Sequence, residues 1–141
     1  MATFNKYNTF IDETSKGGHN LQTAAFKVAL TNTAPTAATD TVWNTTVAPA
    51  PVAASGYTAG GNTLTTSSAA TTTGTFKLVL ADSVFTAAGS SIGPFRYAIL
   101  YNSSATNKSV GYYDYGSSIT LADTETFTVD FDATNGVLTL T

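Results

Sequence analysis

Phe26-Lys27-Val28-Ala29-Leu30 is the stretch of this sequence that decides the fold class. Large apolar side chains alternate along it with smaller or polar ones, which is the pattern of a β-strand with one buried face. Phe76-Lys77-Leu78-Val79-Leu80 repeats the pattern closely. A likeness over so few residues is too short to establish an internal duplication. We therefore interpret the two stretches as separate strands with the same chemistry.

Six further segments carry strand patterns and are separated by turn residues. Short strands of this kind predict an all-β protein, folded as an antiparallel sandwich or barrel of about seven to nine strands. The segments are 62–67, 96–102, 109–115, 117–121, 125–132 and 137–141.

The last two segments predict a β-hairpin. Asn135-Gly136 is typical of a type I′ turn, and a two-residue loop there would pair Phe131 with Leu140. In that register one face of the hairpin is apolar and the other carries carboxylates, so a slip by one residue would bury charge. The buried face would hold Phe127, Val129 and Phe131, and the exposed face Asp130 and Asp132.

Residues 3–13 carry a helical pattern. Their large apolar side chains recur at a spacing that places them on one face of a helix. Thr3 is expected to cap the start, and Gly17-Gly18 to end the helix. A helix of about three turns is marginal alone, so this face must dock on the β domain or on a neighbouring subunit. The face consists of Phe4, Tyr7, Phe10 and Ile11.

Residues 33–61 form a long segment rich in Ala, Pro, Thr and Gly. Its prolines remove donors of sheet hydrogen bonds, and a connection of this length is usually a functional loop or an arm ordered by a neighbour. Trp43 and Tyr57 lie on it, and their rings need a pocket, either over the domain's own open edge or at an intersubunit contact. We expect a helix or arm over 1–18 and a single β domain over 19–141 that includes this loop.

The charge pattern argues against several partners. Charged residues make up only 11% of the chain, the net charge is −3, and the six basic residues are scattered. No cluster could neutralise a row of phosphates, so we expect neither nucleic acid nor membrane as a partner. The absence of cysteine excludes disulfides and thiolate zinc sites. We find no signal-peptide pattern and expect assembly in a reducing cytoplasm.

Residues that could support catalysis do not form a known pattern. His19 is the only histidine, and one histidine without cysteines cannot build a typical zinc site. Asp130 and Asp132 would lie side by side rather than across a cleft, as a glycosidase requires. We interpret them as a solvated face, and a calcium site that adds the Asn135 carbonyl is the alternative. We expect no enzymatic activity, no cofactor and no metal.

Tyrosines gather near two of the strand segments. A tyrosine joins a large ring to a hydroxyl, which suits protein interfaces and sugar platforms. Tyr97 and Tyr101 are expected on one inward strand face. Tyr112 and Tyr113 are consecutive, so in a strand one of them must point outward.

Six segments match patterns that occur together in one group of proteins. Residues 4–10 read F-N-x-[FY]-N-x-F, 19–21 read H-N-L, and 27–35 read K-V-A-L-[ST]-N-[TS]-[AP]-P. Residues 95–102 read F-R-Y-x-x-L-Y-N, 111–116 read G-[YW]-[YFV]-D-[YF]-G, and the end from 125 to 141 matches too. In these motifs the chain resembles a group of small structural proteins of tailed bacteriophages. The similarity covers nearly the whole chain except residues 37–60.

The resemblance implies a virion protein, assembled in the host cytoplasm. We expect a head decoration (cement) protein that binds the outside of a phage head and stabilises contacts between capsid subunits. Its partners would be the major capsid protein and further copies of itself, for example as a trimer. A tail, neck or fibre-associated protein is one alternative, and a carbohydrate-binding module for host attachment is another. The residues expected at the interface are Phe4, Tyr7, Phe10, Ile11, Trp43, Tyr57, Tyr112 and Tyr113.

Overall fold

The computed structural model describes residues 2–44 and 55–141. Their secondary structure is mostly strand, with one short α-helix near the N-terminus, which confirms the all-β class. The helices are α1 (Asn8–Ser15) and a 3-10 turn (Ser103–Ala105). The strands are β1 (Phe4–Lys6), β2 (Phe26–Thr31), β3 (Asn62–Thr63), β4 (Thr66–Thr72), β5 (Thr75–Leu80), β6 (Ser83–Thr86), β7 (Ile92–Asn102), β8 (Lys108–Leu121), β9 (Thr126–Val129) and β10 (Leu138–Leu140).

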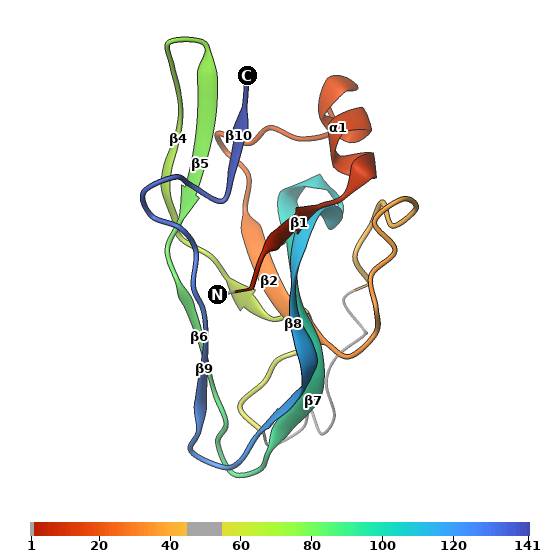
Figure 1. The fold of residues 1–141 in the computed structure, drawn as a ribbon, viewed down its shortest axis with the longest axis vertical. Helices are drawn as coiled ribbons and strands as arrows, with labels where there is room; N and C mark the ends of the chain where they lie inside the picture. The colour runs from red at the N-terminus through yellow and green to blue at the C-terminus, as the bar shows by residue number, and fades with distance from the viewer. Residues whose placement is uncertain (1, 45–54) are drawn as a thin grey trace.

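The strands form three antiparallel sheets. The largest has the order β1-β8-β7-β2-β3, the second β10-β5-β4, and the third consists of β6 and β9. Figure 1 shows the two smaller sheets on one side of β7 and β8, with α1 and the loop that follows β2 on the other side. The central sheet is thus covered on both faces.

Burial along β2 agrees with this arrangement. Val28, Ala29 and Leu30 are consecutive, and each is 0% exposed. Because successive side chains of a strand point to opposite faces, such a run requires cover on both sides. Aromatic rings join the central sheet to the smaller sheets. The ring centroids of Phe95 and Phe127 are 4.9 Å apart, and those of Tyr113 and Phe131 are 5.9 Å apart.

The helical prediction for residues 3–13 is wrong at its start. Phe4 lies in β1, opposite Tyr113 of β8, and α1 begins only at Asn8. Thr3 is therefore no helix cap. The edge of β8 offers backbone hydrogen bonds to Phe4–Lys6, and the Phe4 ring lies over Gly111, where any Cβ would come within 2.2 Å of a ring carbon. These contacts outweigh the helical spacing of the side chains.

The predicted end of the helix is confirmed. The amide of Gly18 donates to the Glu13 carbonyl at 2.7 Å, and the amide of Gly17 donates to the Thr14 carbonyl at 3.0 Å. This pair of bonds is the Schellman motif, which requires a left-handed residue after the helix. Gly17 supplies it with a φ of +78°.

The predicted C-terminal hairpin is wrong in its pairing and right about most of its buried face. β9 pairs with β6, and β10 pairs with β5. The reason is the turn between them, in which the Asp132 carboxylate accepts the amides of Thr134 and Asn135 at 2.8 and 2.7 Å. This capped turn sends the chain to a different sheet. Val129 and Phe131 are nevertheless buried and Asp130 is exposed, whereas Phe127 and Asp132 are only partly buried.

Strand boundaries differ from the prediction in three places. The segment 62–67 divides into β3 and the start of β4, and 109–115 and 117–121 join into the single strand β8. The strand β6 was not expected. With β6 and with β1, which takes the place of the start of the expected helix, the described residues contain ten strands rather than the expected seven to nine.

Candidate functional site

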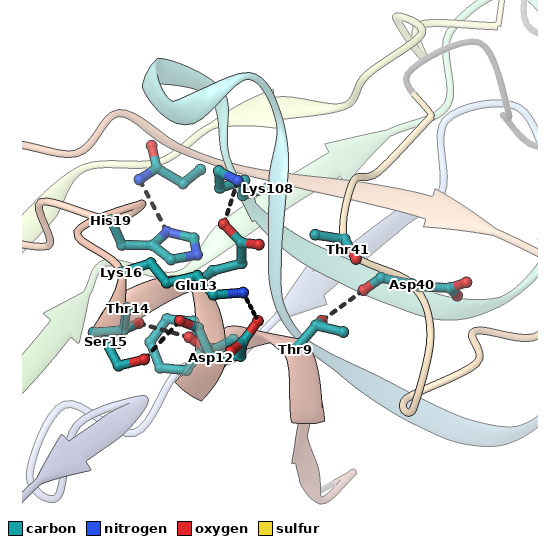
Figure 2. A network of polar contacts seen from close by, with 12 residues as sticks. Thr9, Asp12, Glu13, Thr14, Ser15, Lys16, His19, Asp40, Thr41 and Lys108 are labelled. Atoms are coloured by element: carbon teal, nitrogen blue, oxygen red, sulfur yellow. Dashed lines mark hydrogen bonds and ion pairs between the residues drawn. The ribbon is translucent and has the colours of Figure 1, made fainter.

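The N-terminal helix and the first part of the long loop pack together beside β8. The amide of Asn8 donates to the Ala37 carbonyl, and the Thr9 hydroxyl donates to the Asp40 carbonyl, each at 2.9 Å. Figure 2 shows the second contact between α1 and the loop. We call the outer side of α1 and residues 36–43 the α1–loop surface.

The same loop continues the cover of the β8 edge. The amide of Trp43 donates to the Asn107 carbonyl at 2.8 Å, and the amide of Ser109 donates to the Thr41 carbonyl at 2.9 Å. β1 pairs with the next stretch of this edge, from Gly111 to Tyr113. Trp43 thus packs over its own domain's edge, partly buried against the core.

An ion pair fastens the helix to the sheet. The Lys108 ammonium of β8 contacts the Glu13 carboxylate of α1, and both side chains are mostly buried (Figure 2). A second ion pair lies on the exposed side of the helix, where Lys16 Nζ is 2.5 Å from Asp12 Oδ2. Because it is solvated, this second pair adds little to stability.

His19 lies near this ion pair (Figure 2). Its Nδ1 is 3.3 Å from Asn102 Nδ2, and its ring centroid is 5.0 Å from that of Phe10. Asn102 Oδ1 accepts from Ser104, which orients the amide so that Nδ2 faces the imidazole. Nδ1 is therefore the acceptor, and the neutral ring carries its proton on Nε2. Nε2 is buried and has no hydrogen-bond partner among the described residues.

This setting favours the neutral imidazole. Burial lowers the pKa of His19 below its ordinary value, and the nearby Lys108 charge lowers it further, while Glu13 acts in the opposite direction. The arrangement makes His19 a structural part of the helix attachment.

The eight residues expected at a partner interface differ in exposure. Four lie inside the chain's own core, three are partly buried, and one is exposed. The buried residues are Tyr7, Phe10, Tyr57 and Tyr113; the partly buried ones are Phe4, Trp43 and Tyr112; the exposed one is Ile11.

Tyr57 illustrates why a loop aromatic can belong to the core. The Leu30 amide donates to its hydroxyl at 3.1 Å, and this hydroxyl is 3.3 Å from the Leu30 carbonyl oxygen, to which it donates. Burial raises the pKa of Tyr57 to about 12. The phenol therefore stays protonated and keeps both contacts.

The α1–loop surface has an apolar character that the sequence showed only in part. Among the described residues, the exposed large hydrophobic side chains are Ile11, Val42 and Val84, with 46%, 51% and 52% of their surface accessible. Ile11 and Val42 both belong to the α1–loop surface. The strand pattern gave no signal for Val84, since the sequence did not predict β6.

Ionisable residues elsewhere form structural contacts. In residues 2–44 and 55–141, no three His, Asp or Glu side chains are placed to hold a metal ion. The Arg96 guanidinium donates to both oxygens of Asp114, at 2.7 and 2.9 Å. This contact, helped by the Gly116 amide, lowers the pKa of Asp114 to about 2.

No helix in the described part of the chain is long and apolar enough to cross a membrane.

No family model, curated protein or solved structure matches this chain. Three contacts join the N-terminal segment to β7 and β8. The Phe4 ring covers Gly111, the Tyr7 and Tyr112 rings are 5.3 Å apart, and His19 meets Asn102. These contacts therefore fix how the N-terminal segment packs on β7 and β8.

Proposed function

We propose that this chain is a non-enzymatic structural protein of a phage virion, and specifically a decoration protein on the outside of the head. The observation that carries the proposal is the α1–loop surface, which presents Ile11 and Val42, two of the three exposed large hydrophobic side chains of the described residues, on a weakly charged exterior. Hydrogen bonds and the ion pair of Glu13 with Lys108 hold this surface in place. A preformed surface loses little conformational entropy on binding, which favours a tight static contact.

The partners in this proposal are the major capsid protein and further copies of the chain. Charged residues make up only 11% of the chain, so screening by salt should weaken the contact little. We further propose that the central sheet and the two smaller sheets pack face to face as a β-sandwich. Such a body offers a stable platform from which the α1–loop surface can clamp neighbouring capsid subunits.

The test uses phage heads stripped of decoration and the full-length chain. Removing residues 1–16 would also remove Tyr7 and Phe10 from the core, so surface variants are preferable. Ile11→Asp combined with Val42→Asp should weaken head binding at least about tenfold, because each carboxylate would lose hydration in the contact. Val84→Asp is the matched control, since this valine is equally exposed but lies on β6.

The outcomes separate the site from the assignment. If the double variant melts like wild type and binds heads as tightly, the α1–loop surface is not the contact. If wild type fails to bind heads and mass spectrometry finds it with separated tails, the protein is a tail or neck component.

A carbohydrate-binding module for host attachment is the second candidate. The observation in its favour is a hollow of about 240 Å³ whose lining combines aromatic rings with a carboxylate. Binding of the purified chain on a glycan array, lost in Asp130→Asn, would support this candidate over the structural role. The hollow is lined by Ala2, Tyr113, Tyr115, Thr128 and Asp130.

A further inference from the structure

The strand β4 forms an open sheet edge. It is the last strand in the order β10-β5-β4, and Figure 1 shows it at the outer margin of the molecule. Its seven residues pair with β5 on one side. On the other side, no backbone–backbone hydrogen bond joins it to any described residue, and the one side-chain hydrogen bond to its backbone, from the Thr73 hydroxyl to the Thr72 carbonyl, lies at the turn. Among the described residues, the edge therefore presents unpaired donors and acceptors.

The turn after β4 identifies which residues of this strand direct their backbone amide and carbonyl away from β5. Thr73 and Gly74 have φ angles of 48° and 82°, as in a two-residue type I′ turn. Thr72 and Thr75 then form a hydrogen-bonded pair, and the alternation of an antiparallel ladder follows from it. Ala70 directs its amide and carbonyl to β5, whereas Ala69 and Thr71 direct theirs away from the sheet.

Apart from one irregularity at its start, this edge lacks the devices that usually prevent strand pairing. Proteins protect open edges with charged residues, prolines or covering side chains. Two other strands of this chain show such protection. β1 carries the charged residue Lys6, and on β6 the Val84 carbonyl accepts a hydrogen bond from the Asn62 side chain at 3.0 Å. β4 reads Thr-Ser-Ser-Ala-Ala-Thr-Thr and has no charge or proline. Its one irregularity lies at the start, between Thr66 and Ser68, and leaves the rest of the strand regular.

We propose that β4 pairs with β4 of a second copy of this chain, antiparallel about a twofold axis at Ala69 or Ala70. Either axis sets the outward donors of one strand against the outward acceptors of the other, which is the self-complementarity that a twofold interface requires. The residues brought face to face are only Thr, Ser and Ala, so the pairing meets neither like charges nor bulk. The product is a continuous six-stranded sheet from β10 to its symmetry mate.

The strand contact alone makes a weak dimer. Pairing along seven residues buries less surface than the roughly 1,200–2,000 Å² of stable complexes. We therefore expect a dissociation constant between about 10 µM and 1 mM, which crowding of copies on a particle would overcome. The inference deepens the homo-oligomer part of the proposed function. It is tested on the purified chain, so its failure would leave the virion assignment standing.

Sedimentation equilibrium of the full chain up to about 1 mM measures this pairing. Ala69→Pro removes an outward amide while sparing the bonds to β5, and edge strands accept such a proline. It should weaken association at least about tenfold, a change of about 1.4 kcal/mol. Ala69→Ser keeps the amide and should associate like wild type.

A second variant guards against misfolding of the first. Ala70 is exposed on the outer face, and Ala70→Glu brings the carboxylates of the two copies close together, so it should also weaken association. Circular dichroism and thermal melting establish that each variant is folded. A wild type that stays monomeric at the highest concentration overturns the proposal, as do folded variants at positions 69 and 70 that associate like wild type.

Discussion

Replacing Phe10 with alanine tests whether α1 is an integral part of the folded domain. Phe10 is 0% exposed, and its ring lies against His19 within the main core. Truncation of a fully buried phenylalanine costs about 3–5 kcal/mol, from lost transfer energy and from the cavity left behind. We expect the free energy of unfolding to fall by that amount. This is a large share of the roughly 5–15 kcal/mol of a typical domain.

The adjacent residue provides the control. Ile11 is 46% exposed on the same helix, so Ile11→Ala should cost no more than about 1 kcal/mol. Urea denaturation followed by far-ultraviolet circular dichroism and by fluorescence of Trp43, the sole tryptophan, reports on the sheets and on the α1–loop unit separately.

Two results would refute the reasoning. Equal, small losses for Phe10→Ala and Ile11→Ala would mean that the helix does not dock on the sheet. A Trp43 transition at lower urea than the dichroism transition in wild type would mean that the α1–loop unit unfolds on its own.

Three further substitutions follow from buried contacts. Tyr57→Phe should cost about 1–3 kcal/mol in urea denaturation, because the buried Leu30 amide loses its acceptor; an unchanged midpoint would contradict the contact. Phe131→Ala should cost about 3–5 kcal/mol although no hairpin forms there, because the ring is buried, and a loss below about 1 kcal/mol would contradict that burial. The pKa of His19 is lowered in the native state, so the unfolded chain takes up a proton first as the pH falls below the ordinary value of 6.5. The stability that depends on the neutral ring is complete above that value and is lost as the pH falls from there through the lowered native pKa. Wild type should therefore lose stability toward about pH 5 more steeply than His19→Gln, and parallel profiles would refute this assignment.

Hydrophobic alternation predicted strands and faces but not strand partners. Phe26–Leu30 and Phe76–Leu80 fall within β2 and β5, and Val129 and Phe131 are buried as expected. Alternation specifies which side chains avoid water, and several strands can satisfy that requirement equally. The pairing at the C-terminus depended on the Asp132 carboxylate, which caps a turn that the Asn135-Gly136 signal did not reveal.

The interface residues were harder to predict, for a related reason. The helical spacing of Phe4 and Tyr7 is compatible with a strand followed by a helix, and only the distant edge of β8 decides between them. Tyr57 lies on a segment with loop composition, but its hydroxyl bonds to Leu30, 27 residues earlier. Exposure of Val42 depends in the same way on where the loop meets Asn107 and Lys108.

The pairing of Phe4 with Tyr113 has a consequence for biosynthesis. While the ribosome makes the chain, β1 has no partner until β8 has emerged, so Phe4, Tyr7 and Phe10 stay uncovered for most of translation. Contacts that distant in sequence form slowly, because a long loop must close before they give any stabilisation. Copies that terminate before β8 would keep these aromatic rings accessible to chaperones and proteases, and only chains that include β8 could cover them.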